Sequence, residues 1–158
     1  NTIVEIGVYC LMPNHFHLLI REKREGGITE FMKKISIGYA MYFNKRYDRT
    51  GTLFEGVFKA QYVIFDEYLK YLFAYIHLNP VKLIDKYWKE KGLKDKAKTK
   101  KYLSGYEYSS YKDFIGEERP EKKILNLDNF PDYFSEKHSF QEYLDDCLEF
   151  EDDIIPHE

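Results

Sequence analysis

The stretch MPNHFHLLI, residues 12–20, combines a turn signal, an apolar run and two histidines. A Pro-Asn pair is typical of a turn, and the apolar residues that follow it predict a buried strand. Side chains two residues apart on a strand point to the same face, so His15 and His17 project together while Phe16 points away. Two neighbouring imidazoles form a metal-ligand pair or a paired acid–base site, whereas a single histidine on a strand is usually structural.

The sequence on either side of this stretch predicts further strands and a helix. Residues 3–10 alternate loosely between apolar and polar side chains and predict a strand that pairs antiparallel with a strand at 16–21. Residues 57–65 predict a third strand. Thr29 is a suitable N-cap, and apolar residues at spacings of four and three predict a helix from there to about Tyr47.

The second half of the chain predicts mostly helices. Asp66 is expected to cap a helix that ends near Asn79, because a proline follows and disfavours helix in the residue before it. Residues 86–101 contain eight lysines and predict an exposed helix-loop segment. The aromatic motif at 106–111 is expected to pack rather than to act, and the chain from residue 117 on predicts one or two short helices.

Composition indicates a folded protein of one domain with an appended segment. The chain has 158 residues, of which 44% are hydrophobic, and this excludes a disordered chain. Cys10 and Cys147 lie far apart, which argues for a reducing compartment without a disulfide framework. No apolar run approaches the ~20 residues of a membrane-spanning helix, and no signal peptide is visible. We expect a cytoplasmic protein without membrane contact.

Charge divides the chain into a basic front and an acidic tail. Residues 1–116 carry a net charge of +7 and residues 117–158 carry −10. A basic front suits a polyanion such as nucleic acid, although an ordinary solvated lysine-rich surface gives the same balance. The basic residues that we consider for contact with DNA phosphates are Lys33, Lys34, Lys45, Arg46, Arg49 and Lys59.

Tyr75 and Asn79 lie four residues apart on the predicted helix and therefore share a face. A tyrosine hydroxyl is a poor nucleophile alone, but it becomes competent when a divalent metal polarises its target phosphate. His15, His17 and the Asn79 amide oxygen can supply mixed nitrogen and oxygen ligands, which suit Mg²⁺ or Mn²⁺ better than structural Zn²⁺. Spacing alone also fits a Tyr75 that is an ordinary core residue.

Two motifs, in order and at this separation, resemble the single-tyrosine HUH transposases. They are CLMPNHFHLL at residues 10–19 and YIHLNPV at residues 75–81. Within that family the sequence is most similar to the REP-associated tyrosine transposases. GTLFEGVFK at residues 51–59 and YSSY at residues 108–111 resemble further stretches of the same proteins. The resemblance covers roughly residues 3–116.

The resemblance implies a ferredoxin-like α/β (α+β) fold, with packed helices against an antiparallel sheet, and a transposase activity. His15 and His17 are implied as metal ligands on a central strand, Tyr75 as the nucleophile and Asn79 as a third ligand. The enzyme is implied to cleave and rejoin single-stranded DNA near hairpins through a 5′-phosphotyrosine, with Mg²⁺ or Mn²⁺. The resemblance favours a monomer, but a dimer stays open, because the shorter insertion-sequence relatives exchange the tyrosine helix between subunits. His77 lies about 200° around the helix from the tyrosine and is left out of the site.

One departure from the family concerns the start of the chain. The ferredoxin-like core needs a first strand and helix before residue 3, so we expect an exposed sheet edge unless a preceding segment or a partner chain covers it. The expected parts are an N-terminally incomplete core at 1–84, a lysine-rich connector with the aromatic motif at 85–116 and an acidic, helical extension at 117–158.

Two alternatives remain open from the sequence. A truncated or domesticated relative would hold hairpin DNA without cutting it. A metal-dependent phosphodiesterase would use water as the nucleophile and leave Tyr75 with a structural role.

Overall fold

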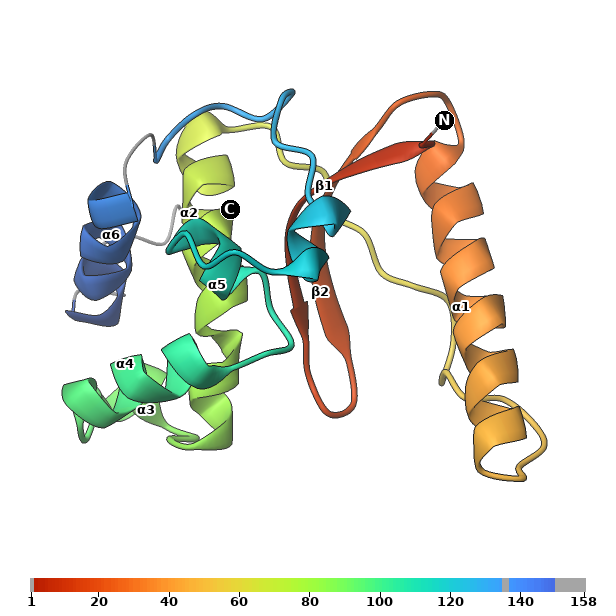
Figure 1. The fold of residues 1–158 in the computed structure, drawn as a ribbon, viewed down its shortest axis with the longest axis horizontal. Coiled ribbons are helices and arrows are strands. Elements are labelled where there is room, and N and C mark those ends of the chain that lie inside the picture. The colour runs from red at the N-terminus through yellow and green to blue at the C-terminus, as the bar shows by residue number, and fades with distance from the viewer. Residues whose placement is uncertain (1, 135–136, 150–158) are drawn as a thin grey trace. The chain divides into compact units, whose positions relative to one another are not determined.

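The computed structural model describes residues 2–134 and 137–149 and has a mixed α/β fold with a two-stranded antiparallel sheet (Figure 1). Within the described ranges, no helix has the length and apolar character needed to cross a membrane. Along the chain the elements are β1 (Val4–Leu11), β2 (Phe16–Glu22), α1 (Gly27–Arg46), α2 (Asp66–Leu78), the 3₁₀ helix η1 (Asn79–Leu83), α3 (Trp88–Lys91), α4 (Lys96–Gly105), α5 (Tyr111–Phe114), the 3₁₀ helix η2 (Pro120–Ile124) and α6 (Lys137–Glu149).

The chain divides into two compact units. The first comprises Asn1–Glu5 and Ile20–Tyr62 and contains α1. The second comprises Ile6–Leu19 and Val63–Glu158 and contains the remaining helices.

The predicted strand pair is confirmed. β1 and β2 are neighbours in the sheet, and a short connection joins them, as an antiparallel pair allows. The backbone N–H of Met12 donates to the carbonyl oxygen of His15 at 2.8 Å and closes the turn. This tight turn fixes the register of β2 and therefore the face on which its two histidines project.

The helix predicted from Thr29 is confirmed, but the expected N-cap is wrong. α1 begins at Gly27, and its N-cap is Gly26, which lies three residues before Thr29 and has a φ of 74°. The Glu22 carboxylate accepts a hydrogen bond from the N–H of Ile28 at 3.0 Å and takes the capping role. A Cβ on Gly27 would lie 2.7 Å from a backbone oxygen, so the tight approach of the chain here requires glycine.

The third strand predicted at residues 57–65 is wrong. This segment has no regular secondary structure, and most of its side chains are exposed, with Val57 at 92% and Tyr62 at 95%. A strand needs a neighbour to satisfy its backbone N–H and carbonyl groups, and no strand of the described chain pairs with this segment. Apolar alternation predicts an extended segment but does not supply its partner.

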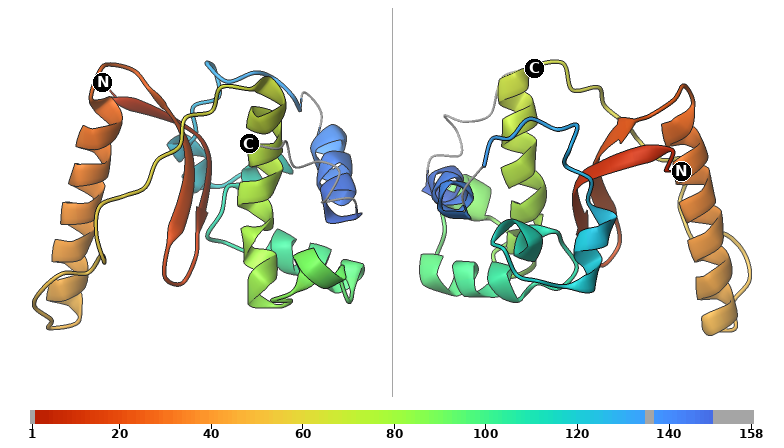
Figure 2. Two further views of the ribbon diagram at one scale, coloured as in Figure 1. Left: turned by 180° about the vertical axis from the view of Figure 1, so that it is seen from behind. Right: turned by 45° about the horizontal axis from the view of Figure 1, so that its top comes forward.

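α2 is the central element of the second unit. Its helix was predicted from Asp66 and is confirmed, although Asp66 is the first helical residue and Phe65 is the N-cap. Apolar side chains of α2 belong to two core clusters, and α6 packs against it (Figure 2). The buried residues that α2 shares with the hairpin are Val8, Cys10, Leu19, Phe73 and Ile76. Those that it shares with the later helices include Ala74, Leu78, Leu103, Phe140, Leu144 and Leu148.

The aromatic motif at residues 106–111 packs against β1, as the sequence predicts. Cys10 and Ser109 form an antiparallel bridge, and the N–H of Leu11 donates to the carbonyl oxygen of Tyr108 at 2.8 Å. The hydroxyl of the fully buried Ser110 accepts a hydrogen bond from the N–H of Tyr9 at 3.0 Å. This segment therefore covers the end of β1 that leads into the histidine turn.

The lysine-rich segment and the acidic extension pair with each other within the second unit. Asp95 caps α4 by accepting a hydrogen bond from the N–H of Lys98 at 2.9 Å. Lys96 forms an ion pair with Glu149, and Lys100 forms one with Asp145 at 2.5 Å. Helical structure expected after residue 117 is confirmed in η2 and α6, and residues 150–158 lie outside the described residues.

Candidate active site

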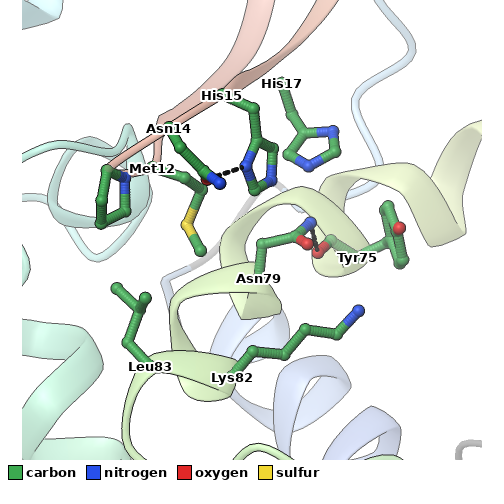
Figure 3. A pocket seen from close by; sticks show the side chains of 9 residues that line it. Met12, Asn14, His15, His17, Tyr75, Asn79, Lys82 and Leu83 are labelled. Atoms are coloured by element: carbon green, nitrogen blue, oxygen red, sulfur yellow. Dashed lines mark hydrogen bonds between the residues drawn. The ribbon is translucent and has the colours of Figure 1, made fainter.

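A pocket of about 550 Å³ lies within the second unit, between the histidine turn and the C-terminal end of α2 (Figure 3). His15 and His17, from the first sequence motif, line this pocket together with Tyr75, from the second motif. The complete lining is Met12, Pro13, Asn14, His15, His17, Tyr75, Asn79, Lys82 and Leu83. The structure therefore brings together the four residues that the sequence singles out for chemistry.

His15 and His17 lie side by side on the pocket. Their ring centroids are 5.0 Å apart, and their ring planes meet at 87°. Nδ1–H of His15 donates to the side-chain oxygen of Asn14 at 2.7 Å, which leaves Nε2 of His15 with its lone pair. A neighbour that fixes the tautomer in this way is typical of histidines that bind metals.

His17 is half-buried, and its surroundings keep it neutral. Burial lowers its pKa from the ordinary value, and the charges of His15 and Lys82 lower it further. A neutral imidazole is the form that binds a metal. The same surroundings therefore favour metal binding at neutral pH.

Tyr75 stands in the last turn of α2, beside His17. The centroids of the two rings are 6.0 Å apart, with an interplanar angle of 79°. Its ring also contacts Tyr71, with centroids 5.8 Å apart, and the ammonium of Lys89 lies 4.9 Å from its centroid. Tyr75 is half-buried and packs beside the core shared by α2 and the hairpin, yet it also lines the pocket.

Asn79 is the first residue of η1 and is 5% exposed. Its side-chain N–H donates to the carbonyl oxygen of Tyr75 at 2.9 Å, which holds the amide one turn beyond that residue. Figure 3 shows this amide rising from the helix toward the two imidazoles. Because the amide nitrogen makes that hydrogen bond, the amide oxygen remains available as a ligand.

The donor set fits a divalent cation with nitrogen and oxygen ligands. Among residues 2–134 and 137–149, no group of three or more His, Cys, Asp or Glu side chains is placed to hold a metal ion. A third protein ligand beside the two imidazoles would therefore be of another type, and Asn79, whose amide oxygen is of such a type, lines the same pocket. Two nitrogens and one amide oxygen leave positions for phosphate oxygens and water, which suits Mg²⁺ or Mn²⁺.

His77 lies outside the pocket, as its position on the helix predicts. It is fully buried, and Nδ1–H donates to the carbonyl oxygen of Phe73 at 2.7 Å. Nε2 is 2.7 Å from the Ser110 hydroxyl, which donates to it in the neutral form. Burial lowers the pKa of His77 to about 3, so this imidazole is a structural hydrogen-bonding group.

The six basic residues considered for DNA contact all lie in the first unit and are exposed. Lys45 and Arg46 occupy the last turn of α1, where basic side chains interact favourably with the negative end of the helix dipole. Lys34 forms an ion pair with Glu30 at 2.7 Å, and the guanidinium of Arg49 lies 5.5 Å from the ring centroid of Phe43. Lys33 is on α1, and Lys59 follows it in a segment without regular structure.

Two lining residues with polar side chains, Asn14 and Lys82, were not predicted from the sequence. Asn14 precedes His15 directly, and a short polar side chain next to a candidate ligand is a usable signal for a tautomer-fixing partner. Lys82 follows Asn79 by three residues, and in the 3₁₀ helix η1 this spacing places both on one side. Pro80 signals the end of the α-helix but not the conformation that follows it.

A family model described as "Transposase IS200 like" matches residues 1–79, which include both histidines, Tyr75 and Asn79. No curated protein and no solved structure matches the chain.

Proposed function

The chain belongs to the IS200-like family of transposases, and on this premise we propose that it cleaves and rejoins single-stranded DNA through a covalent tyrosine intermediate. In this proposal Tyr75 is the nucleophile. His15, His17 and Asn79 hold Mg²⁺ or Mn²⁺, and the substrate is single-stranded DNA next to a hairpin.

One observation carries the proposal. The ring of Tyr75 lies 6.0 Å from that of His17, in a pocket that His15 and Asn79 also line. A phenol, two imidazoles and an amide oxygen from two distant stretches of sequence meet at one solvent-accessible site. A role in packing alone does not require a tyrosine to lie beside two imidazoles and an amide oxygen.

The chemical step is a transesterification. The phenol oxygen of Tyr75 attacks the phosphorus of a phosphodiester, and the bond from phosphorus to the 3′ oxygen breaks. The phenol proton passes to solvent, and the leaving 3′ oxygen takes a proton to become a hydroxyl. The products are a 5′-phosphotyrosine and a free 3′-hydroxyl, so the reverse attack by a 3′-hydroxyl rejoins a strand without an external energy source.

The residues of this chain have separate tasks in that step. His15 and His17 present neutral imidazole nitrogens, and Asn14 fixes the tautomer of the first. Asn79 couples the tyrosine end of α2 to the ligand set, because its amide is hydrogen-bonded to the Tyr75 carbonyl. When bound, the cation supplies Lewis-acid polarisation of the phosphate.

The arrangement supports a tyrosine that acts within its own chain. Tyr75 and the two histidines belong to one compact unit of one chain, and they line the same pocket. We therefore propose a monomer as the active species.

The test is the formation of a covalent adduct. The purified protein is mixed with Mn²⁺ or Mg²⁺ and a library of single-stranded oligonucleotides that carry hairpins, and adducts are resolved on denaturing gels. We expect an adduct with the wild-type protein, none with Tyr75→Phe and none after chelation with EDTA. Tyr71→Phe, one turn earlier on α2, is the matched control and should retain the adduct.

Each of the other outcomes would indicate a different function or a different nucleophile. Hairpin binding that weakens with salt, without any metal-dependent product, identifies a binding relative that does not cut. A free 5′-phosphate with unmodified protein identifies a phosphodiesterase that uses water. An adduct that persists in Tyr75→Phe removes this residue from its role.

A further inference from the structure

The pocket has the charge of an anion-binding site. No Asp or Glu is among its lining residues, whereas two histidines and one lysine are. Within the part of the chain that the structure describes, Lys82 forms no ion pair with a carboxylate, unlike Lys94 and Lys100, which pair with Asp85 and Asp145. An ammonium left without an acidic neighbour at the wall of a pocket is available to a negatively charged ligand.

Local structure places Lys82 on the same side as Asn79. Both belong to η1, a 3₁₀ helix with about three residues per turn, in which side chains three apart lie above one another. Figure 3 shows the lysine side chain running beneath Asn79 toward the side of the pocket at which Tyr75 lies.

We infer that Lys82 binds a non-bridging oxygen of the phosphodiester that Tyr75 attacks. The inference rests on the proposed function and adds a substrate contact to it. An ammonium at this position orients the phosphate beside the phenol oxygen and stabilises the negative charge that spreads over the phosphate oxygens during the attack. The lysine acts as a point charge, so an arginine of similar reach retains most of the effect.

Lys89 has a different place. Its ammonium lies 4.9 Å from the ring centroid of Tyr75 and 5.3 Å from that of Trp88, and it is not among the lining residues. It packs over aromatic rings, as a cation–π partner does. Of these two lysines, only Lys82 lines the pocket itself.

A binding experiment without metal separates this contact from catalysis. The probes are the dinucleotide thymidylyl-(3′→5′)-thymidine and its methylphosphonate analogue, which has the same shape but no charge on phosphorus. Binding is followed by NMR through the ring signals of His15 and His17. We expect the charged dinucleotide to bind the wild-type protein at least fivefold more tightly than the analogue, and Lys82→Gln to abolish this preference.

The controls are chosen to isolate the charge at this position. Lys86→Gln removes an exposed lysine of the same stretch that lines no part of the pocket, and it should leave the preference unchanged. Lys82→Arg should keep most of it. Circular dichroism melts of all variants should coincide with that of the wild type, because Lys82 is exposed.

A kinetic experiment completes the test. With a cleavable hairpin oligonucleotide at saturation, Lys82→Gln should slow single-turnover adduct formation by about 100-fold, as loss of one charge-stabilising donor does. The inference is overturned if Lys82→Gln keeps the wild-type preference for the charged dinucleotide, or if its adduct rate lies within twofold of that of Lys86→Gln. A wild-type protein that forms no adduct but shows the Lys82-dependent preference refutes the proposed function and leaves the phosphate contact standing.

Discussion

The three histidines His15, His17 and His77 have different surroundings, and these decide which can bind a metal. His15 and His17 line the pocket. The hydrogen bond to Asn14 leaves Nε2 of His15 with a lone pair, and burial lowers the pKa of His17 and favours its neutral form. His77 uses both ring nitrogens in hydrogen bonds inside the core. The proposed ligand pair is therefore distinguished from His77 by access and tautomer, not by residue type.

His77 predicts a loss of stability in acid. Its pKa is about 3 in the folded protein and 6.5 ordinarily, so below pH 6.5 the unfolded chain takes up a proton that the folded chain refuses. The contribution of neutral His77 to the free energy of unfolding is complete above pH 6.5. It is lost at up to about 1.4 kcal/mol per pH unit as the pH falls toward 3. Urea unfolding of wild type and His77→Gln at pH 7, 6 and 5 measures it. Parallel pH dependences of the two proteins would contradict the assignment.

At the scale of elements, the site depends on how α2 begins, ends and is held. The helix ends at Leu78, and η1 continues from Asn79 with three residues per turn. Asn79 and Lys82 are three residues apart in η1 and therefore lie on one side of it. The same region is held to β1 by Ser110, whose hydroxyl contacts both the Tyr9 N–H and His77.

Ser110→Ala tests that connection. The substitution leaves the N–H of Tyr9 and Nε2 of His77 buried without their partner, which should lower the free energy of unfolding by about 1–3 kcal/mol. Ser104→Ala on α4 is the control, since its exposed hydroxyl donates to the nearby backbone oxygen of Lys101. Denaturant unfolding of both variants is the measurement, and equal effects would show that the buried hydroxyl is not a structural link.

Sequence reasoning succeeded where a local pattern is sufficient. Helical spacing and the following proline located α2, and period-two alternation located the hairpin. It failed at residues 57–65, because a strand also requires a partner that no local pattern supplies. The four candidate site residues could be named from motifs. Asn14 and Lys82 line the pocket because of the turn and the 3₁₀ helix, and these conformations could not be predicted from single residues.

At the scale of the whole molecule, the proposed tasks are divided between the two units. The second unit contains the pocket, and two of its lysines, Lys96 and Lys100, form ion pairs with acidic residues of the extension. The first unit contains the exposed basic residues of α1 and the segment after it. This division predicts that phosphate contacts along the DNA and the chemistry at one phosphate respond to different substitutions.

Salt dependence tests the division. Replacing Lys45, Arg46 and Arg49 by glutamine should make the dependence of log binding constant on log salt concentration shallower by about 2, as loss of three phosphate contacts to a single strand predicts. Replacing Lys94, Lys96 and Lys100, which are ion-paired in the second unit, should leave the slope unchanged. Fluorescence anisotropy with a labelled hairpin oligonucleotide gives both slopes. An equal change in both triple variants would contradict the division.

The most direct test of the central claim is to locate the nucleotide on the protein. The adduct is digested with nuclease and trypsin, and the peptide of residues 71–82, which contains both Tyr71 and Tyr75, is sequenced by mass spectrometry. The account predicts a nucleotide joined through its 5′-phosphate to Tyr75 and an unmodified Tyr71. A nucleotide on any other residue, or an unmodified protein beside a free 5′-phosphate, would contradict it.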